Sequence, residues 1–224
     1  MKWRLCLLAV LTLIVVTVDT DAETNKSTRV VDARQHGAAS RGRYPYRDKS
    51  TYVLQELDLR AGDVVVDIGA GDGFWTRKMA EAVGPTGVVH AADVDTESVD
   101  RMKRQSQAMP QIRPYVCPTD GTALPENSCD LAFLSKTYHH LNAGGHVDYL
   151  RHLRRVIKPT GRVCVIESHR ALSTGRGRDH AWSPGLLTQQ AEEAGWILVR
   201  CELITGTRHF IAIFVQRDLF DAAS

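Results

Sequence analysis

The sequence predicts an α/β fold in which a mostly parallel sheet is covered by helices on both faces. Two observations carry this prediction. From residue 48 onwards, short apolar runs alternate with amphipathic helical patterns, and such alternation builds a parallel sheet between two helical layers. The last two apolar runs are joined only by Thr205-Gly206-Thr207, a turn too short for any connection except an antiparallel one. The 224 residues suit one domain with a buried core.

The first half of the domain begins with a helix over 48–59, because apolar residues at positions 53, 54 and 57 form one stripe. Ala61-Gly62 ends this helix, and Gly84-Pro85 ends the next one. Asp95 is the expected N-cap of the helix after that. The elements expected after the first helix are strand 63–68, helix 74–83, strand 87–92, helix 95–107 and strand 112–117.

The second half continues the alternation after a loop over 118–128. Lys158-Pro159 ends its first helix, and Ser183-Pro184 supplies an N-cap and a first-turn proline for its second. A basic loop over 169–182 precedes that second helix. The expected elements are strand 129–134, helix 145–157, strand 161–167, a helix from 183 to 195, and strands 196–204 and 208–216.

Residues 1–22 differ in kind from the rest of the chain. Lys2 and Arg4 precede an apolar run over 5–18, and Ala22 offers a small residue for cleavage. The run is shorter than the ~20 residues of a full membrane span, and the charges around it favour export of the downstream chain. We expect a cleaved signal peptide, with an uncleaved membrane anchor as the second interpretation and a misassigned start codon as the third. The protein is then periplasmic or membrane-anchored, and cytoplasmic only if the leader is not genuine.

Residues 23–47 form a polar, turn-rich arm before the domain at 48–224. From Lys26 to Ser50, seven lysines and arginines face two aspartates, a local charge of +5, although the whole chain carries only +2. A solvated arm is the simpler interpretation of such a run, and recognition of an anionic substrate or a membrane surface is the alternative. Tyr44 and Tyr46 are candidate lid residues over a site. The sequence contains no nucleic-acid-reading module, so we expect no nucleic-acid partner.

The turn after the first strand reads D-x-G-x-G-x-G from Asp67 through Gly69 and Gly71 to Gly73. In a parallel sheet this turn lies at the carboxyl edge, where ligands bind, and glycine lets a ligand approach the backbone. The dinucleotide fingerprint G-x-G-x-x-G is not met, because Phe74 stands at its third glycine. No phosphate-binding lysine comes after the turn, which excludes a P-loop. The acidic Asp67 suits a ligand that carries positive charge.

Acidic residues also stand at the end of the second strand and shortly after the third. Asp93 closes the second strand, twenty residues after Gly73, where a carboxylate can accept both hydroxyls of a ribose. Asp120 follows the third strand and is placed to meet an adenine amino group, with a turn-forming aspartate as the simpler interpretation. Together the two positions predict a nucleoside-binding edge.

These residues resemble the class I S-adenosylmethionine-dependent methyltransferases over nearly all of the chain from Lys49. VVDIGAGDG is similar to the first motif of that family, AADVD to its acidic second motif, and CPTDGTALPENSCDLAFLS to its third and fourth. RRVIKPTGRVCVIE resembles the segment before the fifth strand, with Thr160 in place of a glycine. KTYHHL and TGTRHFIAIF resemble a bacterial subgroup of predicted methyltransferases, some of which have export signals.

The resemblance implies a Rossmann-like three-layer sandwich with a seven-stranded sheet in the order 3-2-1-4-5-7-6, its seventh strand antiparallel. It implies S-adenosyl-L-methionine as the cofactor, methyl transfer as the activity and a small-molecule acceptor as the partner, for a monomer or homodimer. The alternative is a non-catalytic binding module that retains the fold. The cofactor-binding residues implied by the motifs are Asp67, Gly69, Ala70, Gly71, Gly73, Asp93, Val94, Asp120, Gly121 and Ser135.

The catalytic candidates follow the fourth strand. Tyr138 is a candidate substrate contact, and His139 or His140 is a candidate general base because the pKa of histidine lies near neutrality. A structural role for the same stretch is the simpler interpretation. Further candidates for the pocket wall are Glu167, His169, His180 and Trp182.

With the implied strand order, Cys117 and Cys129 are not on neighbouring strands, and neither are Cys164 and Cys201. A disulfide needs Cα atoms within ~7 Å, so four free and mostly buried thiols are expected. No metal site is expected either, since the carboxylates and histidines lack ligand spacing. The neighbouring His139 and His140 would point apart on a strand or a helix.

Overall fold

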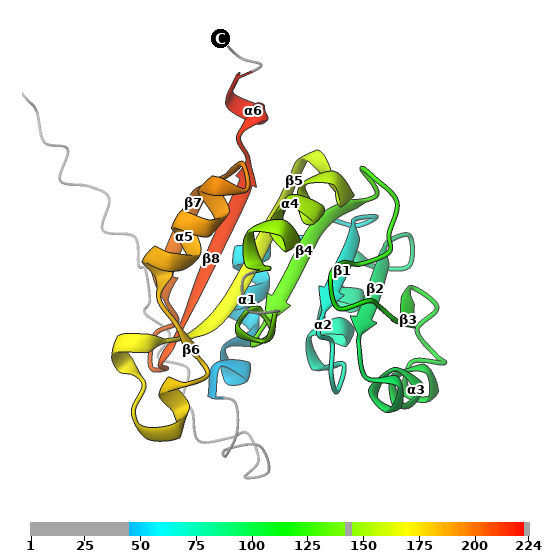
Figure 1. The fold of residues 1–224 in the computed structure, drawn as a ribbon. Helices are drawn as coiled ribbons and strands as arrows, with labels where there is room; N and C mark the ends of the chain where they lie inside the picture. The colour runs from blue at the N-terminus through cyan, green and yellow to red at the C-terminus, as the bar shows by residue number, and fades with distance from the viewer. Residues whose placement is uncertain (1–44, 142–144, 222–224) are drawn as a thin grey trace, which may run out of the picture. The chain divides into compact units, whose positions relative to one another are not determined.

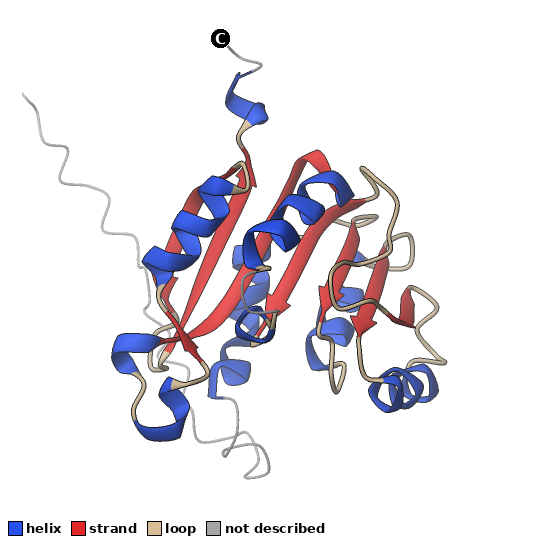
Figure 2. Ribbon diagram, in the orientation of Figure 1, coloured by secondary structure: helices blue, strands red, loops and turns tan. Residues whose placement is uncertain are grey.

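A computed structural model describes residues 45–141 and 145–221 and shows a sheet between two layers of helices (Figures 1 and 2). The leader at 1–22, Tyr44 and most of the basic arm lie outside the described residues. Within the described part of the chain, no helix combines the length and the apolar character needed to cross a membrane.

The strands and helices follow the predicted order closely. The strands are β1 Val64–Ile68, β2 Val88–Asp93, β3 Ile112–Val116, β4 Cys129–Ser135, β5 Ile157–His169, β6 Ala181–Trp182, β7 Trp196–Leu203 and β8 His209–Gln216. The α-helices are α1 Ser50–Leu57, α2 Phe74–Val83, α3 Thr96–Gln105, α4 His146–Val156, α5 Pro184–Glu193 and α6 Asp218–Asp221. The short 3₁₀ helices are η1 Pro45–Lys49, η2 Tyr138–His140, η3 Arg170–Leu172 and η4 Gly175–Arg178.

The sheet order is β3-β2-β1-β4-β5-β8-β7, which confirms the predicted 3-2-1-4-5-7-6 once the short β6 is set aside. β1 to β5 pair in parallel, and β8 pairs antiparallel with both β5 and β7. The unpredicted strand β6 lies in the basic loop over 169–182 and adds two residue pairs to the end of β5. Two residues are too few to leave a periodic pattern in a sequence.

Both faces of the sheet are buried. Successive residues of a central strand point to opposite faces, and on both faces they are apolar. In β4, Leu131 and Phe133 face one hydrophobic cluster, which contains residues of α1, α2 and α3. Ala132 and Leu134 face the other, which contains residues of α4 and α5. Figure 1 shows α4 and α5 in front of the sheet and α1 and α2 behind it. The fold is therefore a three-layer sandwich with two cores.

The largest boundary difference is at β5, which begins at Ile157 and not at 161. Cys129 of β4 pairs with Ile157, whereas Leu131 pairs with Arg162, so the register shifts between the two pairs. The side-chain amide of Gln216 donates to the backbone carbonyls of Ile157 and Lys158 and supports this irregular segment. Pro159, which was expected to end the preceding helix, is accommodated in the bulge, as is usual for proline in a sheet.

Four cysteines are free within the described residues, as predicted. Cys117, Cys129 and Cys164 are buried, and Cys201 is exposed. Burial raises the pKa of the Cys164 thiol, which keeps it protonated and unreactive.

Candidate functional site

The glycine-rich turn after β1 is tied to the end of β2 by its own backbone. The amides of Gly69 and Ala70 both donate to the carbonyl of Ala92, at 2.8 and 3.1 Å. The amide of Gly71 donates to the Asp93 carboxylate at 2.8 Å. The first three N–H groups of the turn are therefore engaged by β2. A phosphate-binding turn presents such groups to its ligand, so this turn is built for a different purpose.

Gly69 is required by its backbone angle and by its neighbour. Its φ is +71°, a region that residues with a Cβ rarely adopt. A Cβ at this position would lie 2.4 Å from Oγ1 of Thr137, which follows β4. Because Gly69 has no side chain, the backbone after β1 can pack closely against Thr137 after β4.

Asp93 lies at the centre of this edge. It is 9% exposed, and its carboxylate accepts from the amides of Gly71 and Asp95, at 2.8 and 2.9 Å. Each carboxylate oxygen has a second lone pair, so both can still accept a hydroxyl. Asp95 is the N-cap of α3, as predicted, and accepts from the amides of Glu97 and Ser98.

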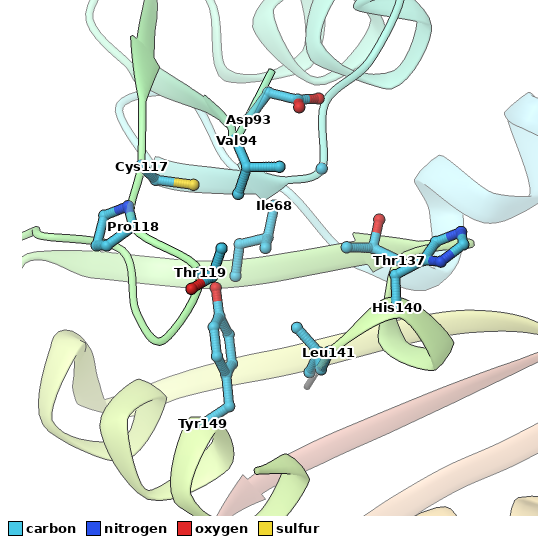
Figure 3. Close-up of a pocket in the computed structure, with 11 residues that line it drawn as sticks. Ile68, Asp93, Val94, Cys117, Pro118, Thr119, Thr137, His140, Leu141 and Tyr149 are labelled. Atoms are coloured by element: carbon cyan, nitrogen blue, oxygen red, sulfur yellow. The ribbon is translucent and has the colours of Figure 1, made fainter. Parts of the chain in front are cut away.

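A pocket opens beside Asp93, with an empty volume of about 510 Å³ that includes its open mouth. Figure 3 shows Asp93, Val94, Cys117 and Pro118 toward one side, and Thr137 and His140 toward the other. The full lining consists of Ile68, Gly69, Asp93, Val94, Cys117, Pro118, Thr119, Thr137, His140, Leu141 and Tyr149. The wall is mostly apolar with few polar groups, which is typical of small-molecule sites.

The predicted cofactor residues divide into two groups. Gly69, Asp93 and Val94 line the pocket. The remaining residues of that prediction are not among the lining residues of the pocket: Asp67, Ala70, Gly71, Gly73, Asp120, Gly121 and Ser135.

Three of these residues have local surroundings that the structure describes. Gly121 is buried, and a Cβ there would lie 3.0 Å from the ring of His152. Asp120 is exposed in the turn beside the pocket residue Thr119. The hydroxyl of Ser135 is 3.0 Å from that of Tyr46. Their direct contact with a cofactor stays a prediction.

Asp67 is placed differently from the expectation that it meets a positively charged ligand. It is 2% exposed, and the Thr76 hydroxyl donates to its carboxylate at 2.5 Å. Burial raises the pKa of Asp67 to about 7, and the nearby Asp93 and Asp72 charges add to this effect. Asp67 is therefore a core residue under the glycine turn.

Tyr46, a predicted lid residue, is also part of the core. It is 1% exposed, and its ring stacks on Trp75 with centroids 6.1 Å apart. Next to it, Arg47 forms two hydrogen bonds with Asp72 in the glycine turn, at 2.7 and 3.0 Å. Residues 45–49 are therefore anchored to the domain at the glycine turn.

The three catalytic candidates lie in one 3₁₀ turn and have different surroundings. Tyr138 is fully buried, and its hydroxyl donates to Gln190 at 3.0 Å. Burial raises its pKa, and it does not line the pocket. His140 is exposed and lines the pocket. Burial and then the neighbouring charges of His139, His180 and Lys136 lower the pKa of His140.

His139 is held by a buried carboxylate. Its Nδ1 lies 2.8 and 3.0 Å from the two carboxylate oxygens of Glu167, which is 0% exposed on β5. Lys136 donates to the same carboxylate at 2.9 Å and to the backbone carbonyl of His180 at 2.8 Å. Burial alone would raise the pKa of Glu167, but the hydrogen bond from His139 and the charge of Lys136 outweigh it and lower the pKa.

The expectation that His139 and His140 point apart is wrong. Their ring centroids are 3.9 Å apart, and the ring of His180 lies 5.4 Å from His139 and 5.9 Å from His140. The two neighbours converge because they sit in a 3₁₀ turn, which is neither the strand nor the α-helix on which the expectation was based.

Lys136 is a site residue that was not predicted from the sequence. It has a φ of +59°, although it is not glycine, and this backbone turn sends the chain from β4 into the histidine segment. Its side chain joins β5, through Glu167, to the basic loop, through the carbonyl of His180. A lysine after a strand has no local pattern that would reveal this role.

Comparison with known proteins agrees with this geometry. Residues 65–161 match the family model described as a methyltransferase domain. The ubiquinone/menaquinone biosynthesis C-methyltransferase UbiE of Burkholderia vietnamiensis is 32% identical over 129 residues, which are 54% of this chain and 50% of that protein. The chain thus spans about half the length of the curated relatives it matches.

Two solved structures have the same fold. A SAM-dependent methyltransferase from Aquifex aeolicus has a TM-score of 0.70 and 26% identity, covering 76% of this chain and 92% of that one. The 1,6-didemethyltoxoflavin-N1-methyltransferase of Burkholderia thailandensis, with bound S-adenosylhomocysteine, has a TM-score of 0.60 and 20% identity, covering 76% and 77%. The domain described above therefore has the same fold as these methyltransferases.

Asp67→Asn should change how stability depends on pH. Because the folded protein keeps the Asp67 proton up to about pH 7, while the unfolded chain loses it near pH 4, this group reduces stability as the pH rises between these values. The reduction is on the order of a few kcal/mol. In urea unfolding at pH 5 and pH 8, the variant should gain stability relative to wild type at pH 8. An equal difference at both pH values would contradict a raised pKa.

Glu167→Gln should destabilise the protein strongly. The substitution leaves the charge of Lys136 without its buried partner, and breaking such a pair costs about 3–5 kcal/mol. Thermal unfolding measures the loss, and the second substitution Lys136→Met should recover most of it. Glu193→Gln is the matched control, because its pair with Arg151 is exposed and worth less than ~1 kcal/mol. A loss as small as that of the control would count against the buried triad.

Proposed function

We propose that this chain, which carries a methyltransferase domain at residues 65–161, transfers a methyl group from S-adenosyl-L-methionine to a small-molecule acceptor. The observation that carries the proposal is the position of Asp93 in a pocket whose other side ends at His140. One side of the pocket suits a nucleoside, and the other carries groups able to act on an acceptor.

The residues present fit the cofactor. Asp93 would accept the ribose hydroxyls, since it lines the pocket, is oriented by two backbone amides and keeps a second lone pair on each oxygen. Val94, Cys117 and Pro118 would pack against the base. The cofactor supplies a methyl group already activated on a sulfonium centre. The protein needs to place the acceptor in line with it, and such positioning can contribute ~7–11 kcal/mol.

The histidines are the residues best placed to meet the methyl acceptor. Among the three catalytic candidates, His140 faces the pocket, His139 is oriented by Glu167, and Tyr138 is buried against Gln190. An acceptor that must lose a proton during transfer would meet His140 first. We therefore assign Tyr138 a structural role and the histidine pair the acceptor role.

A small acceptor is supported by the form of the pocket and by one relative. The pocket wall is mostly apolar with a few polar groups, which is typical of sites that bind small molecules. UbiE, which matches this chain over half of its own length, is a C-methyltransferase of quinone biosynthesis by name. Both features favour a small molecule over a macromolecule as the acceptor.

A non-catalytic binding module is the competing function. In that case the chain would bind a nucleoside and transfer nothing. The competing function is favoured by the predicted export, because S-adenosylmethionine is made in the cytosol. Incubation with isotope-labelled cofactor and extracts of the source cell, followed by mass spectrometry, separates the two. Labelled product supports transfer, and tight cofactor binding without any product supports the module.

Export itself stays a proposal based on residues 1–22. The alternative is a membrane tether through residues 5–18. Fractionation of the source cells tests it, since a cytosolic pool alone would contradict export. The oligomeric state, monomer or homodimer, is measured by light scattering.

Asp93→Asn should weaken the binding of S-adenosylmethionine about 100-fold. The amide keeps one acceptor oxygen but loses the charge, and two hydrogen bonds to a charged group are worth roughly 3 kcal/mol or more. Isothermal titration calorimetry measures the change. Asp100→Asn, an exposed site on α3, is the matched control and should bind as the wild type does. Unchanged affinity in a folded Asp93 variant would remove the basis of the proposal.

A further inference from the structure

We propose that His139, His140 and His180 form a binding site for one divalent transition-metal ion of the Zn²⁺ type, next to the cofactor pocket. One ring nitrogen from each histidine lies within 4.8 Å of the other two. Three imidazoles with a fourth position open are a known ligand set for catalytic zinc.

The distances leave a small adjustment to be made. A tetrahedral zinc ion with Zn–N bonds of ~2.0–2.1 Å needs ligand nitrogens roughly 3.3 Å apart. Closing from at most 4.8 Å requires a shift of about 1.5 Å or less. His140 and His180 are exposed and can supply that shift by rotation of their side chains.

His139 is the fixed ligand. The Glu167 carboxylate occupies its Nδ1 and leaves Nε2 for the metal. A carboxylate on the second nitrogen of a metal-binding histidine fixes the tautomer and the ring orientation. The buried Glu167 therefore has the place that an outer-shell carboxylate takes in metal sites.

Lys136 helps to hold the histidines in place and is not itself a ligand of the metal. Its ammonium group is bound to Glu167 and to the carbonyl of His180, so it holds the basic loop that carries the third histidine. The charges of Lys136 and Glu167 cancel to a first approximation. A dication would then meet three imidazoles and no net charge from this pair.

The open coordination position would serve the acceptor. His140 belongs both to the histidine cluster and to the pocket wall, so a ligand of the metal at this place also borders the cofactor pocket. The ligand class is a small molecule with an oxygen or nitrogen donor, whose proton a bound metal ion makes more acidic. This role rests on the proposed function, whereas the metal site itself does not.

The test is a metal titration of the full chain, expressed without a polyhistidine tag and stripped with a chelator. Co²⁺ should bind at one equivalent and give the visible absorption of a four-coordinate ion, and Zn²⁺ should displace it. His140→Ala and His180→Ala should each lower Co²⁺ affinity by more than about 100-fold, because the loss of an outer-shell group alone costs 10–100-fold. Glu167→Gln should fall within that smaller range.

His90→Asn is the matched control, since His90 lies in β2 next to Tyr115 and away from the cluster. It should bind Co²⁺ as the wild type does. The proposal is overturned if the wild type shows no saturable binding. It is equally overturned if a folded His140→Ala/His180→Ala double variant, checked by circular dichroism, binds as tightly as the wild type.

Calorimetry with S-adenosylmethionine on metal-free and metal-loaded protein separates the two proposals. Metal binding without cofactor binding retains the metal site and refutes methyl transfer. Cofactor binding without metal binding refutes the metal site. Methyl transfer then stays as proposed, with the imidazole of His140 next to the acceptor.

Discussion

The site depends on one hydrogen bond, from the amide of Gly71 to the carboxylate of Asp93. It joins the turn after β1 to the end of β2, and it fixes the carboxylate at the pocket. The same turn uses the amides of Gly69 and Ala70 on the carbonyl of Ala92. These three backbone donors are engaged inside the protein and are not available to a phosphate. The oriented carboxylate suits a sugar with two hydroxyls.

A second carboxylate organises the other side of the edge. Glu167 is fully buried and is stabilised by Lys136 and His139. A buried charge is costly unless it is paired and hydrogen-bonded, so these three groups must keep their positions together. Through Lys136 the constraint extends to the carbonyl of His180. Three segments far apart in the sequence are thereby held within contact distance.

The sequence predicted the features that depend on local pattern. Strand alternation and the glycine spacing led to the fold and, with the family resemblance, to the strand order. Asp93, also predicted, lines the pocket. The burial of Asp67 against Thr76 could not be predicted, because it depends on helix packing, which the motif does not contain. The three-histidine cluster was missed for a different reason. It needs the 3₁₀ turn at 138–140 and a loop residue forty positions away, and no periodicity connects them.

The two carboxylates also explain why the halves of the site differ in kind. Asp93 acts within adjacent strands, and its partners are backbone amides, so its geometry follows from the fold itself. Glu167 acts through the side chains of Lys136, which follows β4, and of His139 in η2. Lys136 in turn binds the backbone carbonyl of His180 in the basic loop, so this geometry depends on which residues those positions carry. A fold of this type can therefore keep the Asp93 edge while the other edge changes with a few side chains. Under the proposed function, the histidines, Lys136 and Glu167 are the set on which the chemistry particular to this chain depends.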